Sequence, residues 1–353
     1  MANILFKRGK HEASFHSPLQ DMQLVNQSLE VRFDPLTGHQ SVFNSALEDK
    51  AKLSFPDTDF DYLEQRAKET EQSCFLCSAD WHKNTPSYPE DFLPSGRLEK
   101  GQATLFPNLF PVAAYHSMIR LGDKHLRKLN DLPAWLLADG FSVALDFVRR
   151  CHGYDPQMRF ATLNANYQLP AGASLIHPHF QILNSPEPST HHQLLLQKCA
   201  EYQAQNTSNY WQDLVQEEKA LGQRWIGQIN GSQWITAFSP MGFNEIQIVW
   251  PERQSFLDWS DQDVQDLALG LNHILGVWHD MNLSSFNFSC FSGPLGQDSP
   301  HFCCIMRIVN RQNVFPHHRT DDFFLQKLMR NELILNKPEK LAQWMQADFP
   351  EKK

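Results

Sequence analysis

The residue types best suited to chemistry lie in one short stretch, His177-Pro-His-Phe-Gln181. We expect this segment to be extended like a strand and, for that reason, the imidazoles of His177 and His179 to point to opposite faces. One ring could then bind a structural ligand while the other presents a nucleophile. Imidazole is a good nucleophile near neutral pH when one nitrogen is free and the other donates to a fixed acceptor. A backbone carbonyl of the same segment is the natural acceptor for His179.

Two histidines at this spacing are often only structural, so the surrounding residues decide the interpretation. Just upstream, Pro170-Ala-Gly-Ala-Ser174 predicts a tight turn. Its backbone N–H groups and the hydroxyl of Ser174 could bind a phosphate group. The stretch therefore predicts a phosphate-binding turn next to a nucleophilic histidine.

A second candidate is a metal site. Cys74-x-x-Cys77 is half of a tetrahedral zinc site, because two thiolates from one turn can bind one ion. No second such pair exists, so the remaining ligands must be histidines. His177 is one candidate, and the fourth ligand could be His82, His116 or His125. The alternative is that the two cysteines are free buried thiols.

The composition limits the classes of function. The net charge is -9, which argues against a protein that holds nucleic acid by bulk electrostatics. The most apolar stretch, residues 135–148, is broken by Asp139 and Asp146, so we expect no membrane span. The first residues lack the apolar core of a signal peptide, and seven cysteines do not suggest a secreted disulfide framework. We therefore expect a cytoplasmic protein.

The elements that position these residues occur twice in the same order, strand–strand–helix–strand–strand. Ser260 with Asp263 three residues later predicts the start of the second helix. The first copy is predicted as strands within 103–121, a helix from about 131 to 150, and strands at 159–167 and 179–183. The second copy is predicted as strands at 234–240 and 245–250, a helix at 260–281, and strands at 286–291 and 302–309.

The repeat extends to the motifs, because His177-Pro-His-Phe180 has a counterpart in Ser299-Pro-His-Phe302. The second copy lacks the first histidine and has Cys303 in place of the glutamine, so we expect the chemistry only in the first copy. This predicts an α+β fold of two similar units, with antiparallel sheets and flanking helices. The predicted division is a polar segment at 1–30, an N-terminal half at 31–189 with both sites, and a C-terminal half at 190–353. The last half begins with helices at 190–222 and ends with a helix at 323–335.

In order along the chain, these motifs resemble the galactose-1-phosphate uridylyltransferase family, the transferase branch of the histidine-triad superfamily. The resemblance covers nearly the whole chain and implies a duplicated histidine-triad-like unit with a degenerate second copy. The matching motifs are Arg32-x-Asp-Pro-Leu-Thr-Gly38, Cys74-x-x-Cys77, Asp123-Lys-His125, the segment from Asn166 to Gln181, and Phe238-Ser-Pro240.

The resemblance also implies roles for individual residues. His179 would attack the α-phosphorus of a nucleotide sugar or dinucleotide and form a covalent nucleotidyl-histidine, which then reacts with a phosphate acceptor. Members of this family are often homodimers. The implied zinc ligands are Cys74, Cys77, His125 and His177, and the implied phosphate-binding residues are Asn166, Gly172, Ser174 and Gln181.

Two residues bear on which reaction is carried out. Hydrolytic histidine-triad enzymes have an imidazole at the position of Gln181, which can protonate a leaving group, whereas an amide can only form hydrogen bonds. This favours transfer to a phosphate acceptor over hydrolysis.

Phe180 stands where the uridylyltransferases usually have glycine, and we expect its ring to crowd the pocket. An aromatic residue here is more similar to the nucleoside-diphosphate-hexose phosphorylase branch. The alternatives are thus a nucleotide-sugar or dinucleoside-polyphosphate phosphorylase, and a nucleotide-binding protein without catalysis.

Overall fold

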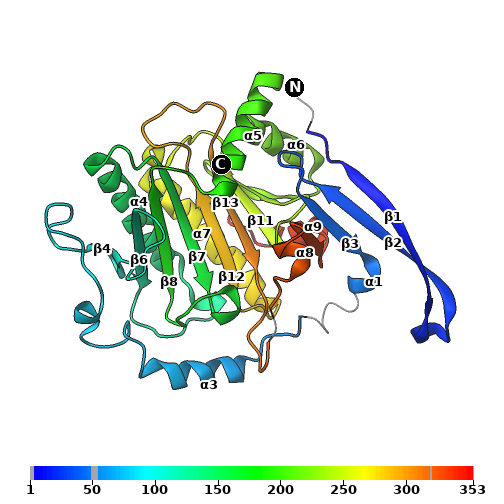
Figure 1. The fold of residues 1–353 in the computed structure, drawn as a ribbon, viewed down its shortest axis with the longest axis horizontal. Helices are drawn as coiled ribbons and strands as arrows, with labels where there is room; N and C mark the ends of the chain where they lie inside the picture. The colour runs from blue at the N-terminus through cyan, green and yellow to red at the C-terminus, as the bar shows by residue number, and fades with distance from the viewer. Residues whose placement is uncertain (1–3, 49–54, 319, 353) are drawn as a thin grey trace.

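The computed structural model describes residues 4–48, 55–318 and 320–352. They form a mixed α+β fold, as the sequence predicts, and it contains two sheets (Figure 1). The larger sheet has ten antiparallel strands in the order β4-β5-β6-β8-β7-β12-β13-β11-β10-β9. Its strands are β4 (Leu98–Lys100), β5 (Ala103–Pro107), β6 (Tyr115–Leu121), β7 (Phe160–Tyr167), β8 (His179–Ser185), β9 (Trp225–Ile229), β10 (Ser232–Thr236), β11 (Phe243–Trp250), β12 (Phe286–Phe291) and β13 (Cys304–Asn310).

The order of strands in the larger sheet is the same when it is read from either end. Three strands, a long helix and two strands make up each half, and the halves meet where β7 pairs with β12. The long helices, α4 (Ala134–Tyr154) and α7 (Asp261–Asp280), pack on each other and on one face of the sheet. The strands of both halves thus form one continuous surface.

Alternation along the strands explains how polar residues reach the other face. In β7 the side chains of Ala161, Leu163, Ala165 and Tyr167 are buried in the core. Successive side chains of a strand point to opposite faces, so Asn164 and Asn166 lie on the face away from α4.

Ser260 caps α7 in a capping box with Asp263, as the sequence predicts.

The smaller sheet joins the two ends of the chain. It has the order β1-β2-β3-β14, with β1 (Arg8–Ser17) at its edge and β14 (Asn331–Ile334) parallel to β3 (Gln40–Asn44). The polar segment predicted at 1–30 forms most of a long hairpin that extends from the body of the molecule (Figure 1). Its second strand, β2 (Gln23–Phe33), crosses residue 30 and continues into the predicted turn.

Several helices differ from the prediction. The helix predicted at 323–335 is wrong, because α8 (Phe324–Lys327) is followed by strand β14. Pairing with β3 overrides the local helical pattern there, since strand pairing satisfies the backbone and buries Ile334. Residues 190–222 form helices as predicted, α5 (Thr190–Asn206) and α6 (Tyr210–Leu221). The sequence prediction missed α1 (Ser45–Glu48), α3 (Phe60–Glu71) and α9 (Pro338–Gln346).

The main core lies between the larger sheet and the pair α4 and α7. Within the described ranges, no helix has both the length and the apolar character needed to cross a membrane.

Candidate active site and metal centre

Four side chains that the resemblance implied as metal ligands lie together. One ligand atom from each of Cys74, Cys77, His125 and His177 falls within 4.8 Å of the others. Cys77 Sγ lies 3.1 Å from His125 Nδ1 and 3.2 Å from His177 Nδ1. Two sulfurs and two imidazole nitrogens are a donor set typical of structural zinc sites. The other histidines considered as ligands lie elsewhere: the ring of His82 stacks on Trp81, and His116 bonds to Gln181.

The two imidazoles are held so that both Nδ1 atoms face the cluster. His177 Nε2 donates to the carbonyl oxygen of Gly122 at 2.9 Å, which leaves Nδ1 unprotonated in the neutral ring. His125 Nε2 lies 3.0 Å from Thr70 Oγ1, and the Thr70 hydroxyl lies 2.8 Å from the carbonyl oxygen of Arg66. Outer contacts of this kind fix ring orientation in metal sites. The residues therefore fit a metal ion.

The protonation of Cys77 and the contacts of Arg120 also bear on this cluster. Burial, with Cys74 alongside, raises the pKa of Cys77 to about 12, so the thiol stays protonated unless a cation binds. Arg120 Nε donates to the carbonyl oxygen of Leu76 at 3.0 Å, and its Nη2 donates to Asp123 Oδ1 at 2.7 Å. Arg120 lies opposite His179 in the β6–β8 pair. It therefore ties the cysteine loop to the strand next to the predicted nucleophile.

His177 and His179 do point in different directions, but not because of strand geometry. Residues two apart in a strand share a face, so the sequence expectation was wrong in its reason. Strand β8 begins at His179, whereas His177 lies in the bend before it. The bend directs His177 to the cysteines and leaves His179 on the sheet.

The ring of His179 is fixed by one backbone contact. Its Nδ1 lies 2.8 Å from the carbonyl oxygen of His177, the predicted acceptor. A carbonyl can only accept, so Nδ1 carries the proton and Nε2 of the neutral ring has a free lone pair. The side chain is buried, and this burial lowers its pKa while the contact with His177 opposes the shift. A buried neutral imidazole with a free Nε2 is competent as a nucleophile.

Gln181 follows on the same face of β8, and His116 orients its amide. The Val112 amide donates to His116 Nδ1 at 3.3 Å, so this ring is protonated at Nε2. His116 Nε2 then donates to Gln181 Oε1 at 2.8 Å. The Gln181 amide nitrogen is left as a donor for a ligand. The sequence analysis named His116 only as a possible metal ligand. It did not predict the contact between His116 and Gln181.

Asn166 is held by a residue of the second half. Asn287 Nδ2 donates to Asn166 Oδ1 at 2.8 Å and to the carbonyl oxygen of Ala171 at 2.9 Å. Arg311 Nη1 donates to Asn287 Oδ1 at 2.5 Å and pairs with Asp321. Asn287 and Arg311 were missed, because only the β7–β12 pairing reveals that they lie here.

The turn before β8 has fewer free donors than the sequence suggests. Gly172 has φ +87°, a conformation that favours glycine. The amides of Ala171, Gly172 and Ala173 all donate to carbonyls of Gln168 or Leu169 within the turn. Ser174 is exposed, and its hydroxyl forms no hydrogen bond with the rest of the described chain. Of the expected phosphate-binding groups in this turn, the hydroxyl and the backbone amide of Ser174 have no hydrogen-bond partner among the described residues.

Phe180 does not crowd this site, contrary to the expectation. It points to the opposite face of β8, where its ring stacks on Phe141 with centroids 5.3 Å apart and lies edge-on to Phe288. A Cβ at Gly140 would lie 3.2 Å from this ring, so a glycine in α4 makes room for it. Phe180 therefore belongs to the core, and strand alternation explains why.

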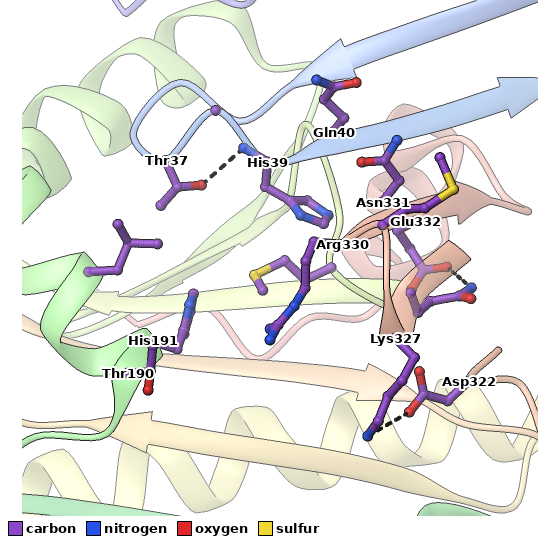
Figure 2. Close-up of a pocket in the computed structure, with 15 residues that line it drawn as sticks. Thr37, His39, Gln40, Thr190, His191, Asp322, Lys327, Arg330, Asn331 and Glu332 are labelled. Carbon is purple, nitrogen blue, oxygen red and sulfur yellow. Dashed lines mark hydrogen bonds and ion pairs between the residues drawn. The ribbon is translucent and has the colours of Figure 1, made fainter. Parts of the chain in front are cut away.

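A cavity of about 680 Å³ lies elsewhere, beside the smaller sheet (Figure 2), and none of its lining residues is a predicted site residue. The assignment of the metal cluster and of the His179 site is therefore based on the contacts between their side chains and does not depend on this cavity.

Comparison with known proteins supports the fold. No protein-family model matches the sequence. An uncharacterized protein of Archaeoglobus fulgidus is 28% identical over 316 residues, which cover 89% of this chain and 90% of that protein. The structure of an ADP-glucose phosphorylase from Arabidopsis thaliana, with bound ADP-glucose, matches with a TM-score of 0.66 at 17% identity, over 90% of this chain and 99% of that chain.

A structure of uridylyltransferase matches with a TM-score of 0.64 at 18% identity, over 74% of this chain and 88% of that chain. At such identities the likeness establishes a shared fold. The resemblance to galactose-1-phosphate uridylyltransferase-like proteins is therefore confirmed at the level of the fold.

Proposed function

We propose that this chain, which shares its fold with a uridylyltransferase and an ADP-glucose phosphorylase, is a nucleotidyltransferase with His179 as its nucleophile. The donor is a nucleotide sugar or a dinucleotide, and the acceptor is a phosphate. The observation that carries this proposal is the contact between His179 Nδ1 and the carbonyl oxygen of His177, which leaves Nε2 free.

The reaction has two balanced steps. His179 Nε2 forms a bond to the α-phosphorus of the donor, and the bond from phosphorus to the bridging oxygen breaks, which releases a sugar phosphate or nucleotide. An oxygen of the acceptor phosphate then attacks the same phosphorus, and the bond to Nε2 breaks. Neither step requires proton transfer, since the leaving and attacking groups are both phosphates. The carbonyl of His177 stabilises the positive charge on the ring of the intermediate.

Gln181 assists without acting as an acid. With its Oε1 held by His116, its amide nitrogen donates to a phosphoryl oxygen, where negative charge is greatest in transfer. An amide cannot protonate an alcohol leaving group or deprotonate water. Phosphate acceptors are therefore favoured over water. Asn166, Gly172 and Ser174 lie in the adjoining strand and turn, and we assign the Asn166 and Ser174 side chains to phosphate binding.

A zinc ion held by Cys74, Cys77, His125 and His177 would have a structural role. The bound ion would fix the bend before β8 and so preorganise His179. All four positions belong to protein ligands, which suits a closed structural site.

The fold is also compatible with a phosphorylase that uses inorganic phosphate as the acceptor, and the same first step would apply. We further propose that the two halves arose by duplication, with the second copy no longer catalytic. The identical strand order from both ends of the larger sheet supports this.

The test is isotope exchange in the absence of a second substrate. A covalent intermediate lets labelled sugar phosphate enter the nucleotide sugar of the same sugar, as ping-pong kinetics require. Wild-type protein should catalyse this exchange and His179→Asn should not. Exchange that persists in His179→Asn would contradict the proposed nucleophile. Release of nucleoside monophosphate without an acceptor would identify a hydrolase instead, and absence of exchange with every donor would favour a binding protein.

A further inference from the structure

The hairpin of β1 and β2 leaves the body of the molecule as a two-stranded arm (Figure 1). Strand β3 pairs with β2 only over residues 29–33, so residues 12–28 have no third strand beside them in the described chain. We call residues 12–28 the hairpin arm. A two-stranded hairpin is at best marginally stable in water by itself. The arm therefore gains stability from any surface that covers it, and the proposed reaction uses none of its residues.

The far end of the hairpin arm exposes large apolar side chains. Phe15, Leu19, Met22 and Leu24 have between 41% and 76% of their surface exposed. Leu5, just before β1, is 73% exposed. Apolar side chains that gather on a surface in this way mark sites of interaction with another protein surface.

The outer edge of β1 has backbone groups available for a further strand. This strand is the last of the smaller sheet, and no other strand in the described ranges pairs with its outer side. The Phe33 amide donates to the carbonyl oxygen of Lys7 at 3.2 Å, so Lys7 faces β2. The register continues without a bulge, and successive residues alternate, so the N–H and C=O groups of Lys10, Glu12 and Ser14 point away from β2. Such an edge can pair with a strand of another chain.

The sequence of β1 is complementary in charge to a second copy of itself. When two antiparallel strands are related by a twofold axis perpendicular to the sheet, one residue lies opposite its own copy. With His11 opposite the partner's His11, Lys10 lies opposite the partner's Glu12, and Glu12 lies opposite the partner's Lys10. This register also pairs the backbone groups that point outward. Centring the pair on Lys10 or on Glu12 would place like charges opposite each other, which is unfavourable.

The same register brings the exposed apolar side chains of two copies together. In an antiparallel pair, the tip of each hairpin arm points toward the residues just before the partner's β1, and Leu5 is exposed there. Phe15 and Leu19 of one copy then lie near the partner's Leu5, and this contact occurs twice. Backbone pairing, charge complementarity and apolar burial therefore favour the same arrangement.

We propose that this chain forms a symmetric homodimer in which the outer edges of two β1 strands pair antiparallel, centred on His11. The two four-stranded sheets then form one continuous sheet across the twofold axis. The interface covers the hairpin arm, which the rest of the described chain leaves exposed. This inference goes beyond the proposed transfer reaction and does not depend on His179.

Disulfide cross-linking of the full chain tests the register. His11 lies in a non-hydrogen-bonded pair of the proposed interface, where opposed Cα atoms are about 4.5 Å apart, a distance that a disulfide can span. His11→Cys should therefore form a covalent dimer on mild oxidation, seen by non-reducing gel electrophoresis. Ser14→Cys is the matched control, because Ser14 is also exposed but lies about 20 Å from its own copy in this register. Wild-type protein, with its own seven cysteines, sets the background. Equal cross-linking of both variants would overturn the register.

Charge reversal with sedimentation equilibrium tests the pairing itself. Wild-type protein should form a dimer, and Lys10→Glu or Glu12→Lys alone should raise its dissociation constant about tenfold or more, because each change creates two pairs of like charge. The double variant Lys10→Glu/Glu12→Lys should restore the wild-type value. Lys100→Glu reverses an exposed charge of β4 and should have no effect, and His179→Asn should dimerise normally.

Thermal unfolding of each variant checks that the fold is retained. A protein that stays monomeric at all concentrations would overturn the proposal. A dimer whose dissociation constant is unchanged by either single reversal would also overturn it, because dimerisation would then use another surface.

Discussion

At the scale of single residues, the candidate site depends on hydrogen bonds that decide which nitrogen of each imidazole is free. His177 and His125 direct Nδ1 to the cysteines, whereas His179 keeps Nε2 free and His116 uses Nε2 to hold Gln181. The residue type alone does not distinguish these roles. The role depends on which group binds the remaining ring nitrogen. For His177 and His179 that group is a backbone carbonyl.

The contact between His116 and Gln181 leads to the first prediction. In His116→Ala, the Gln181 amide loses its fixed orientation, so the transfer rate should fall about 10- to 100-fold. The metal content should not change, because His116 lies outside the cluster. Steady-state kinetics and metal analysis of the purified variant test both statements. His116→Gln keeps an N–H donor near the same position and should restore part of the rate; loss of metal in His116→Ala would contradict the assignment.

The sequence was sufficient for the residues that lie in recognisable motifs, and insufficient for those that act on them from a distance. Cys74, Cys77 and His177 could be proposed from spacing, and His125 was then chosen by resemblance. Asn287 could not be predicted, because it contacts Asn166 only through the pairing of β12 with β7. The bonding of the turn amides within Pro170–Ser174 was also beyond reach, since it follows from backbone angles.

At the scale of elements, α3 shows how a helix missed by the sequence prediction supports the metal cluster. Asp59 caps this helix by accepting from the amide of Tyr62, and its last turn places Thr70 against His125 Nε2. The polar composition of residues 60–71 gave no clear helical pattern. The contact between Thr70 and His125 is what links α3 to the metal cluster.

The second prediction concerns this contact. Thr70→Val keeps the shape of the side chain but removes the hydroxyl that orients His125. Metal affinity should fall about 10- to 100-fold, as for other outer contacts of metal ligands. Competition with a chromophoric chelator measures this affinity. His125→Ala should lose the metal and stability more completely, while Thr70→Ser should retain both; equal metal affinity in Thr70→Val and wild type would contradict the role of α3.

The third prediction concerns β14 and the pH dependence of stability. Burial raises the pKa of Glu332 to about 7 from an ordinary value of 4.5, and Asp321 and Asp322 add to the shift against hydrogen bonds from Leu333 and Gln326. The folded protein therefore binds this proton more tightly than the unfolded chain. The protonated Glu332 carboxyl group therefore adds to the unfolding free energy. This added stability is fully present below pH 4.5 and is lost as the pH rises through about 7. The change amounts to up to about 3 kcal/mol.

Urea unfolding of wild-type protein and Glu332→Gln at several pH values between 4.5 and 8 measures this contribution. The variant should show a smaller loss of stability across the interval. The same loss in both proteins would show that Glu332 titrates near its ordinary pKa.

The prediction of elements succeeded where the hydrophobic pattern is long, as in α4, and where a capping box adds to that pattern, as in α7. It failed for residues 323–335, where pairing with β3 converts a helical pattern into strand β14. It also misjudged Phe180, because the effect of an aromatic residue depends on which face of β8 it occupies.

At the scale of the whole molecule, the second half supports the first. The sheet is continuous across β7 and β12, so Asn287 and Arg311 act beside a segment more than 100 residues earlier. N- and C-terminal elements are linked as well, since the buried Arg32 of β2 pairs with Glu339 of α9. Glu339 also pairs with the buried Arg224, which lies just before β9. The described structure therefore argues against treating the N-terminal half as an independent catalytic unit.

The measurement that tests the central claim most directly is intact-protein mass spectrometry after incubation with nucleotide sugars and dinucleotides. Wild-type protein should gain the mass of one nucleoside monophosphate, and His179→Asn should not, because Nε2 of His179 is the proposed attachment atom. Addition of a phosphate acceptor should remove the adduct. An adduct of the same mass in His179→Asn, or its absence in metal-loaded wild-type protein with every donor, would contradict covalent transfer through His179.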